Sequence, residues 1–159
     1  MRCQLFLEPL EPRFAPATSV LEGVEVFKGT PGNDEFVFDY SPTTGEPSLV
    51  CFDWARFLDP TSNIMDPPLH TYIPLPAGTL SLRVSMGAGD DVFDNRTSLP
   101  ANVDGGAGVD VIMGGSGNDT LKGGGREDFI SGGGGNDIIT GGLGDDELDG
   151  GDGNDVIYG

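Results

Sequence analysis

The C-terminal third of the chain is an internal repeat of nine residues, and this period constrains the fold more than any other feature. From residue 105 to 158 the sequence reads GGAGVDVIM, GGSGNDTLK, GGGREDFIS, GGGGNDIIT, GGLGDDELD and GGDGNDVIY, with no insertion between the units. Positions one and two are glycine in all six units, position six is aspartate in all six, and position eight is isoleucine or leucine in all six. A fixed period of this kind indicates stacked structural units.

Each nonapeptide combines a turn with a short strand. Glycines at positions one, two and four permit positive φ angles, so the first six residues can form a tight turn. The last three residues place one aliphatic side chain between two outward-facing residues, which is the alternation of a β-strand. Successive strands lie on opposite sides of a coil, so the sequence predicts an all-β fold, a right-handed parallel β-roll or β-helix with two units per coil. The predicted central seam consists of Ile112, Leu121, Ile130, Ile139, Leu148 and Ile157.

Burial of apolar side chains alone is not expected to stabilise such a roll. Six aliphatic side chains bury little surface compared with the entropy lost in ordering a glycine-rich chain. Stacking the aspartates above one another adds repulsion between like charges. A hard divalent cation removes this repulsion, and Ca²⁺ is favoured over Mg²⁺ because it accepts six to eight oxygen ligands in flexible geometry.

The pattern G-G-x-G-x-D-x-U-x resembles the calcium-binding nonapeptide of RTX, or haemolysin-type, proteins, and the resemblance covers residues 105–158. It implies that each calcium ion lies between a turn and the turn two units on, with aspartates and main-chain carbonyls as ligands. The implied aspartate ligands are Asp110, Asp119, Asp128, Asp137, Asp146 and Asp155. They form four pairs, Asp110 with Asp128, Asp119 with Asp137, Asp128 with Asp146, and Asp137 with Asp155.

Arg126 departs from the pattern, because it replaces the position-four glycine of the third unit. One interpretation is that its side chain extends to solvent while Gly125 absorbs the turn. The other is that its β-carbon and its charge weaken the sites that use Asp128.

Two segments before the array resemble single, degenerate repeat units. Residues 29–37 read GTPGNDEFV and residues 86–94 read MGAGDDVFD, with an aspartate at position six and phenylalanine at position eight of each. Asp34 and Asp91 are therefore two further candidate metal ligands. The alternative is that both segments are ordinary tight turns, with Phe36 and Phe93 in the core.

The composition changes near residue 104. Residues 105–159 hold 20 of the 27 glycines and none of the 12 prolines. We expect three regions: a flexible leader over 1–19, an irregular β cap with degenerate repeat units over 20–104, and the calcium-binding roll over 105–159. Alternating stretches at 35–38, 49–54 and 80–85 predict short strands in the cap. Residues 55–79 contain five prolines and His70, and we expect a loop there.

Charge and targeting features bear on partners and location. The chain has 26 acidic and 8 basic side chains, a formal net charge of −18, which argues against binding to nucleic-acid phosphates or anionic membranes. No apolar run approaches the roughly 18 residues of a membrane span. Residues 7–14, LEPLEPRF, resemble the LEPR-type motif near the start of many bacterial surface and secreted proteins. The alternative for this segment is a proline-rich leader.

Catalytic patterns are scarce. The single histidine excludes the zinc-protease motif H-E-x-x-H, and neither a G-x-S-x-G elbow nor a phosphate-binding loop occurs. We therefore expect a secreted or cell-surface calcium-binding module without a catalytic role, which folds on binding calcium outside the cell. Its expected partners are calcium ions and, for an adhesive module, a cell surface or a second copy of the chain. The alternative is a fragment of a larger RTX-type secreted hydrolase or adhesin whose active or binding domain lies elsewhere.

Overall fold

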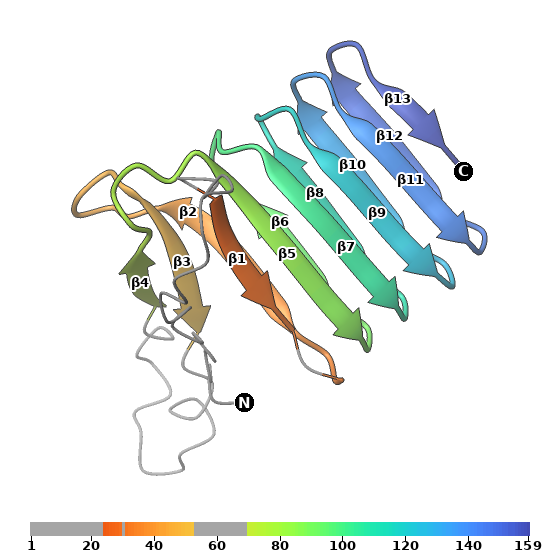
Figure 1. Ribbon diagram of the computed structural model, residues 1–159, viewed down its shortest axis with the longest axis horizontal. Helices are drawn as coiled ribbons and strands as arrows, with labels where there is room; N and C mark the ends of the chain where they lie inside the picture. The colour runs from red at the N-terminus through yellow and green to blue at the C-terminus, as the bar shows by residue number, and fades with distance from the viewer. Residues whose placement is uncertain (1–23, 30, 53–69) are drawn as a thin grey trace, which may run out of the picture.

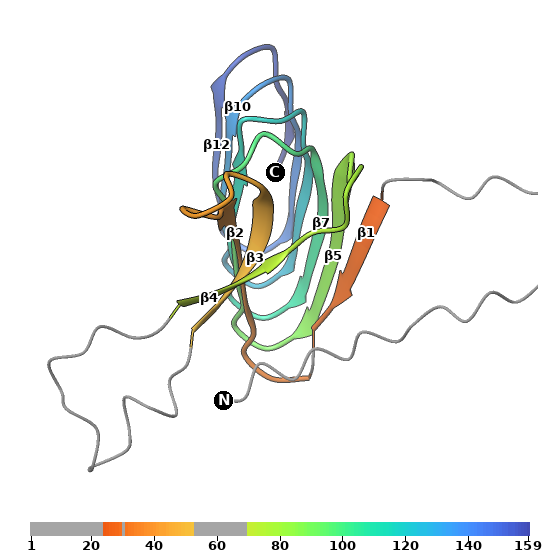
Figure 2. The same cartoon turned by 90° about the vertical axis from the view of Figure 1, so that its left-hand side faces the viewer.

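The computed structural model describes residues 24–29, 31–52 and 70–159, and in these ranges it contains β-strands and no helix. The strands belong to two sheets, and the chain passes from one sheet to the other at almost every turn (Figure 1). Viewed from the N-terminal end, the coils lie behind one another as closed loops (Figure 2). The predicted all-β class and the parallel β-solenoid are confirmed.

Within the described ranges, the two sheets differ by one strand. Sheet A has six strands, in the spatial order β1 (Val24–Lys28), β5 (Ser81–Ala88), β7 (Ala101–Ala107), β9 (Thr120–Gly125), β11 (Ile138–Leu143) and β13 (Val156–Tyr158). Sheet B has seven strands, in the order β12 (Glu147–Asp152), β10 (Phe129–Gly134), β8 (Val111–Gly115), β6 (Val92–Asn95), β2 (Glu35–Tyr40), β3 (Pro47–Phe52) and β4 (His70–Pro74).

The strand register repeats every two nonapeptides. Ile112 in β8 pairs with Ile130 in β10, and Leu121 in β9 pairs with Ile139 in β11. This register confirms the prediction of two units per coil. These four side chains are between 0% and 3% exposed and form the predicted seam. The seam is less covered at its C-terminal end, where Ile157 in β13 is 45% exposed.

The strand ladders continue across residue 104, although the composition changes there. β7 spans this point, and it pairs in parallel with β5, which pairs in parallel with β1. In sheet B, β8 continues in parallel to β6 and then to β2. Aromatic side chains enlarge the core in these N-terminal coils, with Phe38 placed 5.0 Å from Phe27 and 5.8 Å from Phe93 between ring centroids.

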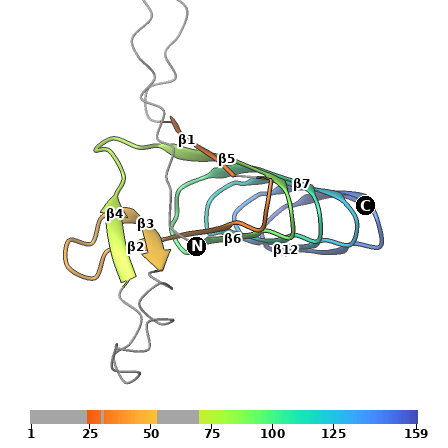
Figure 3. The same cartoon turned by 90° about the horizontal axis from the view of Figure 1, so that it is seen from below.

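Two antiparallel strands extend sheet B at its N-terminal end (Figure 3). β3 follows β2 in a hairpin, and β4 pairs with β3. The strands predicted over 35–38, 49–54 and 80–85 correspond to β2, β3 and β5. The loop predicted over 55–79 is wrong at 70–74, where β4 forms; Pro74 ends this edge strand, a position that tolerates proline. The leader over 1–19, the LEPR-like segment, the last two residues of the strand predicted over 49–54 and residues 55–69 of the predicted loop lie outside the described residues.

Candidate metal sites

The turns between the two sheets form two rows along the solenoid. The first row joins sheet A to sheet B and carries Asp34, Asp91, Asp110, Asp128 and Asp146; the second row joins sheet B to sheet A and carries Asp119, Asp137 and Asp155. In all six nonapeptides the position-two glycine has a φ between 85° and 126°. A side chain is strained in this conformation, so position two requires glycine.

One oxygen of each array carboxylate connects adjacent coils. The backbone N–H of Asp110 donates to Oδ1 of Asp128 at 2.9 Å. The same bond joins Asp119 to Asp137 at 2.8 Å, Asp128 to Asp146 at 3.0 Å, and Asp137 to Asp155 at 2.9 Å. The structure therefore brings together the aspartate pairs expected from the sequence, and it links them by backbone-to-carboxylate hydrogen bonds.

The second carboxylate oxygen is buried and unpaired in the inner turns. Among the described residues, Oδ2 has no hydrogen-bond partner in Asp91, Asp110, Asp119, Asp128 and Asp137. These five residues are between 0% and 2% exposed. A buried carboxylate oxygen without a partner is unfavourable, and either a proton or a cation would satisfy it.

The position-one glycine lies directly against this second oxygen. A β-carbon at Gly105 would lie 2.5 Å from Oδ2 of Asp110 and 2.6 Å from the carbonyl oxygen of Gly123, in the next coil. The position-one glycines do not adopt a positive φ, so here glycine is required for close approach and not for a turn angle. The carbonyl of Gly123 was not assigned from the sequence. The feature that could have indicated this carbonyl is an invariant glycine at a position where no positive φ is needed, because such a glycine marks a close approach.

Burial raises the pKa of the inner aspartates. The pKa of Asp110 rises to about 6 and that of Asp119 to about 7, in both cases mainly because burial removes water from the carboxylate. A backbone N–H bond to each carboxylate opposes the rise, and the aspartate of the next coil adds to it. Desolvation is also the main cause of the raised pKa of Asp91, Asp128 and Asp137. The calcium-free turns therefore hold carboxyl groups that ionise with difficulty.

The chemistry of these groups fits calcium. The polar atoms nearest to the β-carbon position of each array position-one glycine are oxygens, either a carboxylate Oδ2 or a main-chain carbonyl. Such hard donors suit Ca²⁺. In the part of the chain that the structure describes, no three His, Cys, Asp or Glu side chains gather as a metal-binding group. Any calcium site in these turns therefore depends on main-chain oxygens as well as on aspartates.

Asp34 and Asp91 extend the first row beyond the nonapeptide array. The N–H of Asp91 donates to Oδ1 of Asp110 at 2.9 Å, and the N–H of Asp34 donates to Oδ1 of Asp91 at 2.6 Å. Asp91 is buried like the inner array aspartates, whereas Asp34 is half-buried. Phe93 lies in the core and Phe36 packs against it, as expected if both segments are also structural turns.

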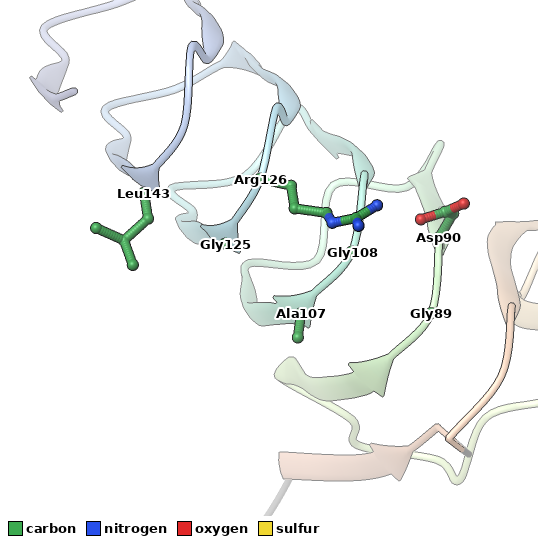
Figure 4. A pocket seen from close by; sticks show the side chains of 7 residues that line it. All are labelled: Gly89, Asp90, Ala107, Gly108, Gly125, Arg126 and Leu143. Carbon is green, nitrogen blue, oxygen red and sulfur yellow. The ribbon is translucent and has the colours of Figure 1, made fainter.

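Arg126 itself adopts the left-handed conformation, with a φ of 84°. The expectation that Gly125 absorbs the turn is therefore wrong, because the position-four residue keeps its place in the coil whatever its side chain. The Arg126 side chain is exposed and lies along a surface groove, where it extends past Gly108 toward Asp90 (Figure 4). Leu143 lines the same groove.

Fold and turns together define a class: a β-solenoid with a nine-residue period whose turns hold buried carboxylates. Residues 104–139 and 122–157 match the family model of the RTX calcium-binding nonapeptide repeat (four copies), which confirms the RTX resemblance for this part of the chain. RTX nonapeptide repeats bind calcium ions, and the roll that they form is a structural domain. No match was found among the curated proteins or the solved structures.

Proposed function

We propose that the chain is a secreted or cell-surface module whose roll folds when calcium neutralises the aspartates of its turns. The observation that carries this proposal is the set of buried Oδ2 atoms without partners among the described residues; the four that belong to array aspartates each lie beside a position-one glycine. The proposed ligands in the array are Asp110, Asp119, Asp128, Asp137, Asp146 and Asp155, together with position-one carbonyls of the following coil such as those of Gly123, Gly132 and Gly150.

Calcium dependence follows from the electrostatics of the turns. Without a cation, folding transfers several carboxylates out of water and stacks them at the spacing of adjacent coils. With calcium, the binding free energy becomes folding free energy, because the site does not exist in the unfolded chain. Extracellular modules bind calcium at concentrations of roughly 10⁻⁴–10⁻³ M, far above the cytosolic calcium concentration. The chain would therefore fold only after it has left the cell.

The proposed role is structural and has no catalytic component. The net charge of −18 favours cationic partners over nucleic acids or anionic lipid surfaces. Within the described residues there is no helix of the length and apolar character that a membrane crossing requires. A calcium-rigidified roll can also act as a spacer or an adhesive surface.

A calcium titration of the full chain tests the proposal. Far-UV circular dichroism at pH 7.5 should show little β-structure in chelator and a cooperative gain of β-structure at millimolar calcium, with magnesium at the same concentration as the control. Calorimetry on the same samples should detect bound calcium. A roll already rich in β-structure in chelator would contradict calcium-coupled folding, and an absence of calcium binding would contradict the proposed ligands. Appearance of the chain in the medium or on the surface of producing cells tests the location, and retention inside them would contradict it.

A further inference from the structure

The two rows of turns end differently on their N-terminal side. The first row continues beyond the nonapeptides to the turn that holds Asp91. The second row ends at the turn over 95–100, which contains no aspartate. This difference determines how many ions the roll can hold.

Asp91 repeats the hydrogen bonds of an inner array aspartate, although Met86 stands at position one of its unit in place of glycine. Its Oδ1 accepts from the N–H of Asp34 at 2.6 Å, and its own N–H donates to Oδ1 of Asp110 at 2.9 Å. It is 1% exposed, and its Oδ2 has no partner among the described residues. The hydrogen bonds and burial of Asp91 are therefore those of Asp110 and Asp128, although Asp91 lies outside the matched residues 104–157.

The Asp91 turn stacks on the Asp34 turn although a large insertion separates the two in the sequence. Asp34 precedes Asp91 by 57 residues instead of 18, because β3 and β4 intervene. Even so, the side chain of Asn33 accepts from the N–H of Asp90 at 3.0 Å, just as Asn118 accepts from Asn136 at 2.8 Å inside the array. The turn before the array thus has the geometry of an array turn.

The second row ends in a neutral amide. Ala101 stands where an aspartate would be expected, since its N–H donates to Oδ1 of Asp119 at 2.7 Å. Asn95, which is 2% exposed, donates through Nδ2 to the carbonyl of Gly114 at 2.7 Å. Gly114 is a position-one glycine, and its counterpart one coil on, Gly132, presents its carbonyl beside the Oδ2 of Asp119. A hydrogen-bond donor here satisfies the carbonyl, and no carboxylate requires a cation.

We propose that Asp91 is a ligand of a fifth calcium site outside the nonapeptide array, and that the Asn95 amide closes the second row without a metal. The inference rests on the proposed function and fixes its stoichiometry. The roll binds one ion for each buried, unpaired Oδ2, which gives five ions in the described residues. Three of them lie in the first row, at Asp91, Asp110 and Asp128, and two in the second, at Asp119 and Asp137.

Calorimetric titration of the full chain with calcium at pH 7.5 tests this assignment. The unsubstituted chain should bind five ions and Asp91→Asn four, since asparagine keeps the acceptor for Asp34 but loses the charge. Asp90→Asn is the matched control and should bind five. Asp90 is exposed, and asparagine retains the oxygen that accepts from Val109 at 3.0 Å. Asn95→Asp should bind six, because it places a carboxylate against the Gly114 carbonyl.

The outcomes separate this inference from the proposed function. A count of four in both the unsubstituted chain and Asp91→Asn overturns the Asp91 site and leaves the array sites standing. A count of zero overturns the proposed function itself. If Asp91→Asn does not fold, the unsubstituted chain decides alone, with five ions supporting the site and four overturning it. A count of five in Asn95→Asp overturns the role given to Asn95.

Discussion

Replacing Asp119 with asparagine should stabilise the roll much more without calcium than with it. The Asp119 side chain is 2% exposed, and its Oδ1 accepts from the N–H of Ala101 at 2.7 Å. Asparagine preserves this acceptor and replaces the unpaired Oδ2 with an amide that can donate to a carbonyl. The chain already contains such a pair, since the Asn95 amide donates to the carbonyl of Gly114.

The magnitude follows from the perturbed ionisation of Asp119. Burial raises its pKa from 3.8 to about 7. The stability linked to the protonated carboxyl is complete below pH 3.8, declines as the pH rises and is lost above about pH 7, a difference of about 4 kcal/mol. In chelator at pH 8, Asp119→Asn should recover up to this amount. In calcium the variant also loses the ion, which contributes about 2.7 kcal/mol when calcium is at 100 times its Kd, so its net gain should fall to about 1 kcal/mol.

The assay is the folded fraction measured by far-UV circular dichroism at pH 8, in chelator and in millimolar calcium. Sucrose added to both samples brings the calcium-free chain into its transition, because excluded osmolytes favour the compact state. Asp145→Asn is the control; its side chain is exposed, so the stability should change by less than about 0.5 kcal/mol in either condition. Destabilisation by Asp119→Asn in both conditions would refute the reasoning that buried charge opposes calcium-free folding.

Three other perturbations test separate parts of the structure. In chelator the melting temperature should fall between pH 4 and pH 8, since burial raises the pKa of Asp110 to about 6 and of Asp119 to about 7; a rise would contradict this. Arg126→Gly should stabilise the fold by about 1 kcal/mol in urea titrations, because it relieves a φ of 84°. The same substitution should also tighten calcium binding at the sites that use Asp128, and an unchanged calcium affinity would contradict this expectation. Ile139→Ala should cost about 2–5 kcal/mol in calcium, since Ile139 is 0% exposed, and a loss below 1 kcal/mol would argue against a packed seam.

The nonapeptide period was sufficient to predict the coils. Once position eight is apolar in every unit, only one register keeps these residues inside, and the observed pairing of Ile112 with Ile130 has that register. The period also placed Asp110 opposite Asp128, because equivalent positions in stacked coils lie directly above one another. A repeat determines structure in this way because each local preference is reinforced at the next turn.

The sequence was less informative where the period is interrupted. The insertion that contains β3 and β4 separates Asp34 from Asp91 by 57 residues, so their hydrogen bond could not be inferred from spacing. The role of Asn95 was missed because it depends on a side-chain contact to Gly114 in the next coil. The carbonyl beside Asp110 was missed because every backbone carries carbonyls, and only the fold selects which of them face a carboxylate.

Under the proposed function, the need for calcium should be unevenly distributed along the roll. The N-terminal coils bury aromatic side chains, with Phe27, Phe38 and Phe93 in contact, and antiparallel strands extend their end. The C-terminal coils have a single aliphatic residue per strand in the core and an aspartate in every turn. Burial therefore supports the first part of the solenoid, whereas charge opposes the second. Because Asp91 lies where these parts meet, an ion bound there would couple the turn before the array to the coils in which buried charge opposes folding.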